Sequence, residues 1–281
     1  TQLNSAMPSD APTSFIDSGF TTKVEYEAWL TTPRGSSVAA VSVMPTLGYW
    51  KIRGLAAACR MMFYYKGKSY KEVAYGEDAK VEWFGGDKKA LAEKNPMMNL
   101  PYIVDGETVV TQSNSCLIYL GQVLGIDQAD CMVHNHQAMD QTMDLRNDLM
   151  KIVYGPAGKD FKAALTGHMG GASKHFAKLN GFCKGPYTCG SAIQSADFHI
   201  FEMLDQHVKM CTETGVAFEL ETAFPKLAAL HTTMKADPKL AKYFASDPYT
   251  KYAVNNALYA NYNGAHYKGP YGPTIRVEVA L

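Results

Sequence analysis

The chain has 281 residues, 47% of them hydrophobic, which is enough for one large domain or two modest ones with a packed core. This composition excludes a disordered, collagen-like or repeat architecture for the whole chain. The 27 Lys and Arg balance 27 Asp and Glu, so net charge gives no reason to expect nucleic acid or an anionic membrane as the partner. The most apolar stretches, such as residues 38–44 and 55–63, are shorter than a membrane span of about 20 residues. We therefore expect a soluble protein.

Residues 1–43 differ in composition from the rest and are expected to form an N-terminal extension. They are rich in Ser and Thr, whereas regular apolar patterns begin at about residue 44. The chain starts at Thr1, which suggests a processed precursor or a numbering that begins inside one. Acidic residues such as Asp10 and Glu25 argue against an intact transit peptide. We expect a cytoplasmic protein and leave open that the extension is the remainder of a precursor.

The cysteines are expected to be reduced, mostly buried thiols of an intracellular protein. They are spread without a C-x-x-C motif, and several fall in apolar helical patterns. The spacing of Cys131, His134 and His136 does not place all three on one face of a helix, so no metal site is expected. The six cysteines are Cys59, Cys116, Cys131, Cys183, Cys189 and Cys211.

Residues 44–126 are predicted to form a compact α/β domain with the order βαβαββα. Apolar residues recur at helical and at strand spacing in turn, Gly67 ends the first helix, and Asp105-Gly106 favours a turn between two strands. Strands are expected at residues 46–50, 70–75, 102–104 and 108–110, and helices at residues 53–65, 87–93 and 113–123.

Residues 127–258 are predicted to form an all-α domain. Long amphipathic segments are separated by Gly-Pro and Phe-Pro steps. These segments lie at residues 128–154, 159–179, 195–210 and 225–236. Residues 259–281 are dense in Tyr, Asn and Gly and end in an alternating, strand-like stretch, and we expect them to form a C-terminal tail.

Three blocks in chain order carry a resemblance to a known family. They are Leu47-Gly48-Tyr49-Trp50-Lys51-Ile52-Arg53-Gly54-Leu55-Ala56, Asn99-Leu100-Pro101-Tyr102 and Thr111-Gln112-Ser113-Asn114. With their α/β spacing and the helical domain that follows, they resemble the cytosolic glutathione transferases, most closely the Mu class and its Sigma and Pi relatives. The resemblance covers residues 44–250. It implies a thioredoxin-like N-terminal domain, an all-α C-terminal domain and glutathione as the co-substrate.

The second and third blocks supply the residues that, by this resemblance, hold the glutathione backbone. The Leu100-Pro101 bond is expected to be cis and, next to Asn99, to present the Leu100 backbone to the extended peptide. The alternative is an ordinary trans proline that opens a strand. Gln112 and Ser113 are expected at a helix N-terminus, whose N–H groups suit the γ-glutamyl carboxylate. Ser113 alternatively caps the helix, and the two roles are compatible.

The glycyl carboxylate of glutathione needs a donor and a cation. The resemblance assigns the indole N–H of Trp83 and the ammonium of Lys88, with Trp50 also at the glutathione site. Lys89 is not distinguished from Lys88 by sequence, and Lys80 stands where the Mu class often has arginine. The segment that follows Trp83 is longer than in the Mu pattern.

Tyr49 is the expected catalytic residue, because the resemblance places the activating hydroxyl at the end of the first strand. A thiol of pKa near 8.5 is a few per cent ionised at neutral pH, and about 90% ionisation requires about 3.4 kcal/mol. One hydrogen bond to a charged group contributes about 1.5 to 3 kcal/mol. Helix N-termini and a nearby cation such as Arg53 are expected to contribute the remainder. The alternative is a core tyrosine with a tethered hydroxyl.

In the helical domain the resemblance assigns two further residues. Asp144 is expected to reach the glutathione amine of a dimer partner, and Tyr154 to face the electrophile as a proton donor. The alternatives are a solvated helix charge and a core tyrosine. Leu55 is expected to line an apolar electrophile subsite with Tyr154 and Trp50, and a contribution from the Tyr-rich residues 259–271 is left open. The Mu class has an aromatic key before Asn-Leu-Pro, whereas Met97 stands here, so the dimer geometry is left open.

Two functions follow as hypotheses. The first is a homodimeric glutathione transferase that adds the glutathione thiolate to hydrophobic electrophiles, with no metal, nucleic acid or membrane span. The second is a transferase fold reused as a structural or docking component of a larger assembly, motivated by segments 1–43 and 259–281, which the fold does not need. The complete set of Tyr49, Asn99-Leu100-Pro101 and Gln112-Ser113 favours the enzyme.

Overall fold

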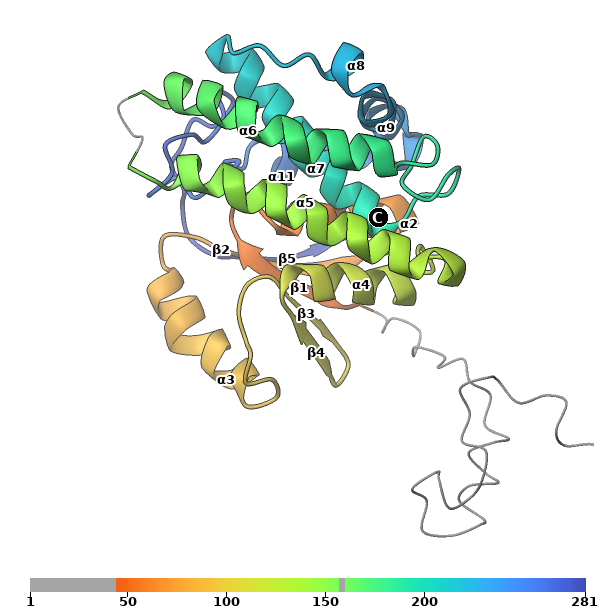
Figure 1. Cartoon of the computed structure of the whole chain (residues 1–281). Helices are drawn as coiled ribbons and strands as arrows, with labels where there is room; N and C mark the ends of the chain where they lie inside the picture. The colour runs from red at the N-terminus through yellow and green to blue at the C-terminus, as the bar shows by residue number, and fades with distance from the viewer. Residues whose placement is uncertain (1–43, 157–159) are drawn as a thin grey trace, which may run out of the picture. The chain divides into compact units, whose positions relative to one another are not determined.

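The computed structural model describes residues 44–156 and 160–281, which are drawn in colour in Figure 1. Residues 1–43 and 157–159 lie outside the described residues, and the predicted N-terminal extension is therefore outside them too. All described residues belong to one compact unit, Ala40–Leu281. They form an α/β part, then a helical part, and a last strand that returns to the first sheet.

A mixed sheet of five strands, in the order β4-β3-β1-β2-β5, forms the centre of the α/β part. β1 is parallel to β2, and the other neighbouring pairs are antiparallel. Because β1 and β2 run in the same direction, both end at one edge of the sheet, where Trp50 pairs with Tyr75. The strands are β1 (Thr46–Trp50), β2 (Tyr70–Tyr75), β3 (Tyr102–Asp105), β4 (Thr108–Thr111) and β5 (Ile275–Val279).

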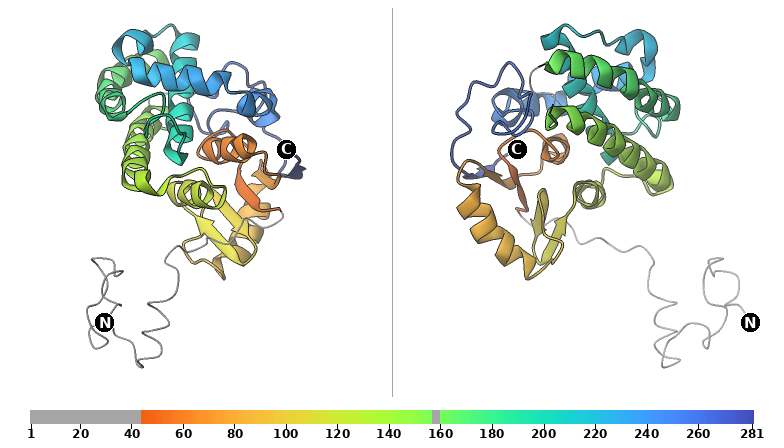
Figure 2. Two further views of the ribbon diagram at one scale, coloured as in Figure 1. Left: turned by 90° about the vertical axis from the view of Figure 1, so that its right-hand side faces the viewer. Right: turned by 60° about the vertical axis from the view of Figure 1, so that its left-hand side comes forward.

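Helices cover both faces of this sheet, and the predicted βαβαββα order is confirmed. In the right-hand view of Figure 2 the strands lie between α3 on one side and α4 on the other. Gly67 ends α2 with a left-handed φ of 59°. A π-helix, η2, contains Trp83 and runs directly into α3. The helices are α2 (Ala56–Lys66), η2 (Lys80–Asp87), α3 (Lys88–Ala92) and α4 (Ser113–Val123).

The second part is helical, as predicted, and α7 lies at its centre. Residues 195–207 of α7 are all buried, since α5, α9 and α2 pack around it. The Asp197 carboxylate caps its start by accepting the N–H groups of Gln194 and Thr188 over 2.8 and 2.9 Å. Among the described residues, no helix combines the length and apolarity of a membrane span. The elements are η3 (Ala129–Cys131), α5 (Met132–Val153), α6 (Phe161–Phe182), α7 (Ser195–Thr214), α8 (Leu220–Ala223), α9 (Pro225–Ala236), η4 (Pro238–Leu240), α10 (Ala241–Ala245) and α11 (Asp247–Thr250).

The C-terminal segment, which we expected to be a tail, is part of the fold. β5 pairs with β2 along its whole length and is the edge strand of the sheet. Arg276 of β5 forms ion pairs with Asp87 and Glu82 at 2.8 and 3.0 Å. Tyr262 and Tyr271 are 9% and 5% exposed. The alternating pattern predicted a strand in this segment, but alternation alone does not identify the strand that it pairs with.

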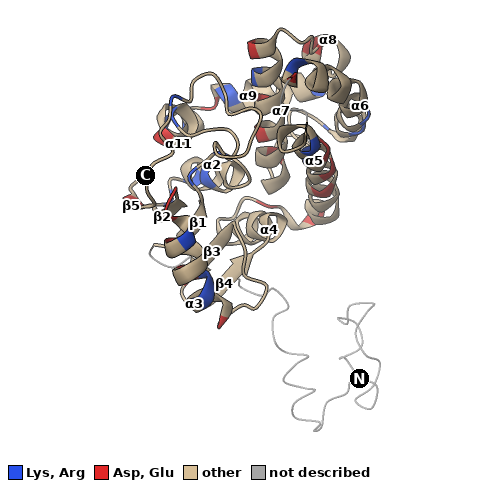
Figure 3. Cartoon of the chain, turned by 90° about the vertical axis from the view of Figure 1, so that its left-hand side faces the viewer, with Lys and Arg blue, Asp and Glu red and all other residues tan. Residues whose placement is uncertain are grey.

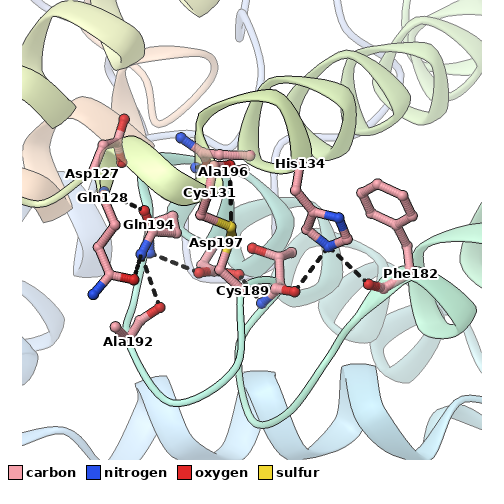
Figure 4. Close-up of a disulfide and its surroundings, with 12 residues drawn as sticks. Asp127, Gln128, Cys131, His134, Phe182, Cys189, Ala192, Gln194, Ala196 and Asp197 are labelled. Carbon is pink, nitrogen blue, oxygen red and sulfur yellow. Dashed lines mark hydrogen bonds between the residues drawn. A yellow bond between two sulfur atoms is a disulfide. The ribbon is translucent and has the colours of Figure 1, made fainter. Parts of the chain in front are cut away.

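Two of the six cysteines form a disulfide, so the expectation that all are reduced is wrong. Cys131, at the start of α5, is joined to Cys189, in the loop before α7, as Figure 4 shows. The other cysteines are free and buried. A separation of 58 positions gives no sign that two residues adjoin across helices, and sequence alone does not determine connectivity. The disulfide ties the start of α5 to the approach to α7.

Charged residues of both signs lie on helices throughout the described chain (Figure 3), and two groups of them are buried. Arg60 of α2 and Glu72 of β2 are 2.6 Å apart and attach this helix to the sheet. Arg53, in the turn between β1 and α2, binds carboxylates of α7. The second group connects the α/β part to the helical part next to Tyr49.

Candidate active site

Tyr49 lies near the end of β1 with its ring buried and its hydroxyl at the start of α2. It is 4% exposed, and the backbone N–H of Leu55 donates to its hydroxyl over 3.1 Å. Gly54 lies against the ring, where a Cβ would come within 2.7 Å of a ring carbon and 2.8 Å of the hydroxyl. A residue with a side chain would displace the tyrosine. Because the hydroxyl oxygen accepts the Leu55 N–H, its own proton can be donated to a ligand.

Burial favours the protonated form of the Tyr49 hydroxyl, and the positive charge nearby opposes it. Burial raises the pKa of the Tyr49 hydroxyl, and Arg146 and the Leu55 N–H offset only part of the rise. Arg146, in α5, is half-buried and forms no ion pair within residues 44–156 and 160–281. It also lowers the pKa of Tyr154 and of the buried His199. The positive charge of Arg146 therefore acts on this site.

Arg53 does not supply the positive charge that we expected of it. Its guanidinium is 1% exposed and lies 2.7 Å from both Glu202 Oε2 and Asp205 Oδ2. Burial alone would raise the pKa of the Asp205 carboxyl, but Arg53 and a hydrogen bond from His231 hold that pKa well below its usual range. One cation between two carboxylates leaves no net positive charge. Arg53 is therefore a structural connection between the turn after β1 and α7.

The loop before β3 has the geometry predicted for the second block. The Leu100-Pro101 peptide bond is cis, as expected. Thr111, the last residue of β4, donates to the Asn99 carbonyl over 2.7 Å and accepts the Asn99 N–H over 3.1 Å. The Leu100 N–H donates to the Asn99 side chain over 2.9 Å, and Asn99 itself is exposed. These bonds hold the second and third blocks together.

Gln112 and Ser113 lie at the start of α4, as predicted. Gln112 has a φ of 72°, and no other non-glycine residue in the described ranges has a positive φ. Such a conformation costs about 1 to 3 kcal/mol and persists where the surrounding structure enforces it. Ser113 is the first helical residue and is 9% exposed, and no side chain caps this helix end. The N–H groups of the first turn therefore remain available to an anion.

The segment expected to hold the glycyl carboxylate is arranged differently from the resemblance. Trp83 is 1% exposed, and its ring stacks on Tyr102 with centroids 5.8 Å apart. Phe84 is 51% exposed instead, and its ring lies 6.1 Å from that of Trp50. Lys88 Nζ lies 5.6 Å from the Phe84 ring. The structure thus brings Lys88 and Trp50 together around Phe84, while Trp83 faces the core, because the π-helix changes which residues point outward.

The residues predicted in the helical domain lie in or near α5. Tyr154 directly follows α5, is 42% exposed, and accepts the N–H of Asn256 over 2.9 Å. Burial raises the pKa of Tyr154, and the neighbouring Tyr49 adds to the rise. Asp144 is exposed on α5, where a group that acts on a partner subunit must be. Leu55 is half-buried beside Tyr49.

Two residues near Tyr49 received no catalytic role in the sequence analysis. Arg146 lies about two helical turns before Tyr154, so helical spacing places both on one side of α5 and was a usable signal. Tyr271 is buried, and burial, Tyr49 and Tyr154 raise its pKa. The Tyr-rich residues 259–271 were considered for the electrophile subsite, but no pattern in them singled out Tyr271 or its return to the first strand.

Two of the three residues considered for a metal, Cys131 and His134, are engaged in other contacts. Cys131 is in the disulfide, and His134 Nε2 lies 3.0 Å from the backbone oxygens of Phe182 and Thr188 (Figure 4). In the ranges that the structure describes, no group of three or more His, Cys, Asp or Glu side chains is placed to hold a metal ion. The polar groups around Tyr49 are hydroxyls, N–H groups and cations, which suit an anionic organic ligand.

Family models match both parts of the chain. Residues 45–122 match the model described as glutathione S-transferase, N-terminal domain, and residues 143–247 match the C-terminal domain. The chain is 30% identical to the glutathione S-transferase class-mu 26 kDa isozyme 51 of Fasciola hepatica, over 78% of this chain and 95% of the relative. It is also 30% identical to glutathione S-transferase Mu 1 of Oryctolagus cuniculus, over 74% of this chain and 94% of the relative.

Solved structures share the fold. The crystal structure of the glutathione S-transferase Blo t 8 superposes with a TM-score of 0.63 at 22% identity, covering 78% of this chain and 99% of that chain. The Pi-class glutathione S-transferase of Onchocerca volvulus superposes with a TM-score of 0.58 at 22% identity, covering 75% and 97%. The described fold thus has the two-part architecture of these structures.

Proposed function

The chain belongs to the glutathione S-transferase family, and we propose that it conjugates glutathione to hydrophobic electrophiles through a thiolate stabilised at Tyr49. The observation that carries this proposal is the polar environment at the end of β1. The Leu55 N–H already bonds to the Tyr49 hydroxyl, and the charge of Arg146 acts on the same hydroxyl. A protonated donor beside a cation that forms no ion pair among the described residues favours a thiolate over a thiol.

The magnitudes agree with this assignment. About 90% ionisation of a thiol at neutral pH requires about 3.4 kcal/mol. The Tyr49 hydroxyl contributes about 1.5 to 3 kcal/mol as a donor to a charged acceptor. Arg53 is neutralised by Glu202 and Asp205, so the remainder comes from groups on the other side of Tyr49. Arg146 is one of them.

Glutathione lies across the edge formed by the second and third blocks. The γ-glutamyl carboxylate takes the N-terminal N–H groups of α4 at Gln112 and Ser113. The cysteinyl backbone pairs with Leu100. The glycyl carboxylate binds Lys88, which is half-buried against Phe84 beside Trp50. Its exposed neighbour Lys89 and the core residue Trp83 are less suited to this contact.

In the reaction the thiolate sulfur forms a bond to the electrophilic carbon, and the leaving group departs with its electron pair. Where that group is an oxygen, as in an epoxide, Tyr154 donates a proton to it. The hydroxyl of Tyr154 accepts the Asn256 N–H and keeps its own proton for this step. Leu55 and the Trp50 ring supply apolar surface for the electrophile.

The enzyme acts as a cytoplasmic homodimer. Asp144 is exposed on α5 and reaches the glutathione amine of the partner, and Met97, 65% exposed, serves as the key that inserts into the partner. The docking role rested on two terminal segments that the fold does not need. Pairing of β5 with β2 accounts for the order of the C-terminal segment without a larger assembly.

Tyr49→Phe tests the proposal, because it keeps the ring and removes the hydroxyl. The ultraviolet absorbance of the bound thiolate against pH is expected to show a pKa about one to two units higher than in the wild type. Conjugation at neutral pH is expected to slow about 10- to 100-fold and to recover in alkali, with little change in the KM for glutathione.

The matched control is Tyr259→Phe, because Tyr259 is 74% exposed. This variant is expected to behave as the wild type. Equal titration curves and turnover for wild type and Tyr49→Phe would assign the activation to another donor. No bound thiolate in any of the proteins would contradict the enzyme itself.

A further inference from the structure

The chain that leads to and from Tyr271 is fastened across the ends of β1 and β2. The Glu77 N–H donates to the Gly272 carbonyl over 2.9 Å, and Lys51 Nζ donates to the Pro273 carbonyl over 3.2 Å. The approach is so close that a Cβ at Gly76 would collide with the Gly272 carbonyl. Residue 271 is therefore held beside the turn that follows Tyr49.

The same segment is fixed on both sides of this crossing. On the near side, the Asn261 N–H donates to the Val153 carbonyl over 2.8 Å, which attaches the segment to the end of α5. On the far side, Thr274 accepts the Gly76 N–H over 3.1 Å, and the pairing of β5 with β2 begins at the next residue. The position of Tyr271 is thus set by the sheet and by α5 together.

The Tyr271 hydroxyl is buried and has no hydrogen-bond partner among the described residues. A buried hydroxyl without a partner lowers the stability of the fold, because it loses its hydrogen bonds to water on folding and forms none with the protein. Burial raises the pKa of Tyr271, and the nearby Tyr49, Tyr154 and Tyr267 add to the rise, so two of its neighbours are the other tyrosines of the site. The Lys51 backbone is near enough to lower that pKa, but not in hydrogen-bonding geometry.

We propose that Tyr271 is a second hydrogen-bond donor to the thiolate of bound glutathione, next to Tyr49. This inference rests on the proposed function and extends it to a residue of the C-terminal segment. The sulfur anion accepts several donors at once, so the two hydroxyls do not compete for it. The assignment explains why a tyrosine, rather than a phenylalanine, occupies a buried position without a partner in the chain.

The contribution of Tyr271 has the size that the site requires. One donor at Tyr49 falls short of the stabilisation needed for full ionisation of the thiol at neutral pH, and Arg53 is neutralised. A second hydroxyl that donates to the same sulfur is expected to lower the thiol pKa by about one further unit, which is a tenfold change in ionisation. The third tyrosine, Tyr154, stays available to the electrophile.

The test is Tyr271→Phe, with Tyr259→Phe as the matched exposed control on the same segment. The pKa of the bound glutathione thiol is read from thiolate absorbance in the dimeric, full-length protein. It is expected to rise by about one unit in Tyr271→Phe, and turnover below that pKa to fall up to tenfold. The melting temperature is expected to stay the same or to rise, because the hydroxyl that is removed has no partner.

A second arm uses Tyr49→Phe alone and combined with Tyr271→Phe. If Tyr271 contacts the sulfur, the thiol pKa of the double variant is expected to lie about one unit above that of Tyr49→Phe alone, since Arg146 is the same in both. An unchanged thiol pKa in Tyr271→Phe overturns the inference, whether or not the KM for the electrophile changes, and leaves the proposed function intact. A wild-type protein that binds glutathione without forming a thiolate overturns both.

Discussion

Tyr49, near the end of β1, and Arg53, in the turn that follows it, are four positions apart, yet their polar groups are used differently. Arg53 is 1% exposed and saturated, with Glu202 and Asp205 each 2.7 Å from its guanidinium. The Tyr49 hydroxyl accepts one N–H and retains its proton. On the side of Tyr49, Arg146 forms no ion pair within the described ranges, and the Tyr271 hydroxyl has no partner there. We call the surroundings of Arg53, where the charges are paired, the closed side, and the surroundings of Tyr49, where donors remain for a ligand, the open side.

Residues that stabilise the fold and residues that are available for the reaction thus lie only a few positions apart in the chain. A buried cation that is surrounded by carboxylates contributes by keeping those carboxylates paired, and its removal leaves uncompensated buried charge. A buried donor that the protein does not satisfy lowers the stability of the fold, but it is available to a ligand. Changes on the closed side should therefore alter unfolding, and changes on the open side should alter the thiol pKa.

The largest expected effect is that of Arg53→Gln on stability. Glu202 and Asp205 are buried, and without the guanidinium their charges are unpaired. The free energy of unfolding is expected to fall by about 3 to 5 kcal/mol, as measured by the denaturant midpoint. Lys94→Gln is the control, because the Lys94–Glu107 pair is 50% and 93% exposed and should contribute less than about 1 kcal/mol. Equal losses in the two variants would contradict the closed network.

The next effect is that of the disulfide, which lies in the helical part at the start of α5. Cys131→Ser is expected to lower the free energy of unfolding by about 2 to 4 kcal/mol, because the unfolded chain is no longer restrained by a long loop. A reductant should lower the denaturant midpoint of the wild type and leave that of the variant unchanged. The bound thiol pKa should be the same in both. A wild-type midpoint that ignores reductant would mean that the two thiols are not bonded in solution.

Asp144→Ala tests whether the open side extends to a partner subunit. If Asp144 binds the partner's glutathione amine in a shielded cleft, its loss should cost about 1.5 to 3 kcal/mol of binding and raise the KM for glutathione about 10- to 100-fold. The KM for the electrophile and the melting temperature should hardly change. Asp130→Ala, another exposed acid of the helical part, serves as the matched control. An unchanged glutathione KM in a confirmed dimer would remove Asp144 from the site.

The sequence motifs predicted features that depend on the local backbone, but they did not predict features that depend on contacts between residues far apart in the chain. The cis bond at Leu100-Pro101 and the helix start at Ser113 are properties of short segments, and both were found as expected. Trp83 was misplaced because a π-helix changes the direction of side chains, and no residue type signals such a turn. Arg53 was taken for a free cation because its two carboxylates come from a distant helix.

The C-terminal segment shows the same limit more strongly. Alternation of apolar and charged residues predicted the strand at its end, although Val277 on its apolar face is 46% exposed. Pairing with β2, and the return of Tyr271 to Tyr49, join residues that are about 200 positions apart, and period and propensity contain no information on such contacts. The same holds for the disulfide between Cys131 and Cys189.

The smallest effect that we expect is that of Arg146→Gln, which measures how strongly the charge of Arg146 acts on the groups near Tyr49. A half-buried charge acting through partly solvated protein shifts a neighbouring pKa by about half to one unit. The thiol pKa of bound glutathione should rise by this amount, because the cation that favours the thiolate is gone. The free energy of unfolding should change by less than about 1 kcal/mol, since the substitution breaks no ion pair among the described residues.

His199 gives an independent measurement of the same charge. Burial, and then Arg146, lower the pKa of His199 to about 3. Replacing Arg146 removes a repulsion of the imidazolium, so the His199 pKa should move upward, in the same direction as the thiol pKa but without any ligand present. Titration of the His199 ring protons by NMR, in wild type and variant, would follow it. A rise at His199 without a rise at the thiol would show that Arg146 faces α7 and not the sulfur, and the thiolate would then depend on the tyrosine hydroxyls and the Leu55 N–H alone.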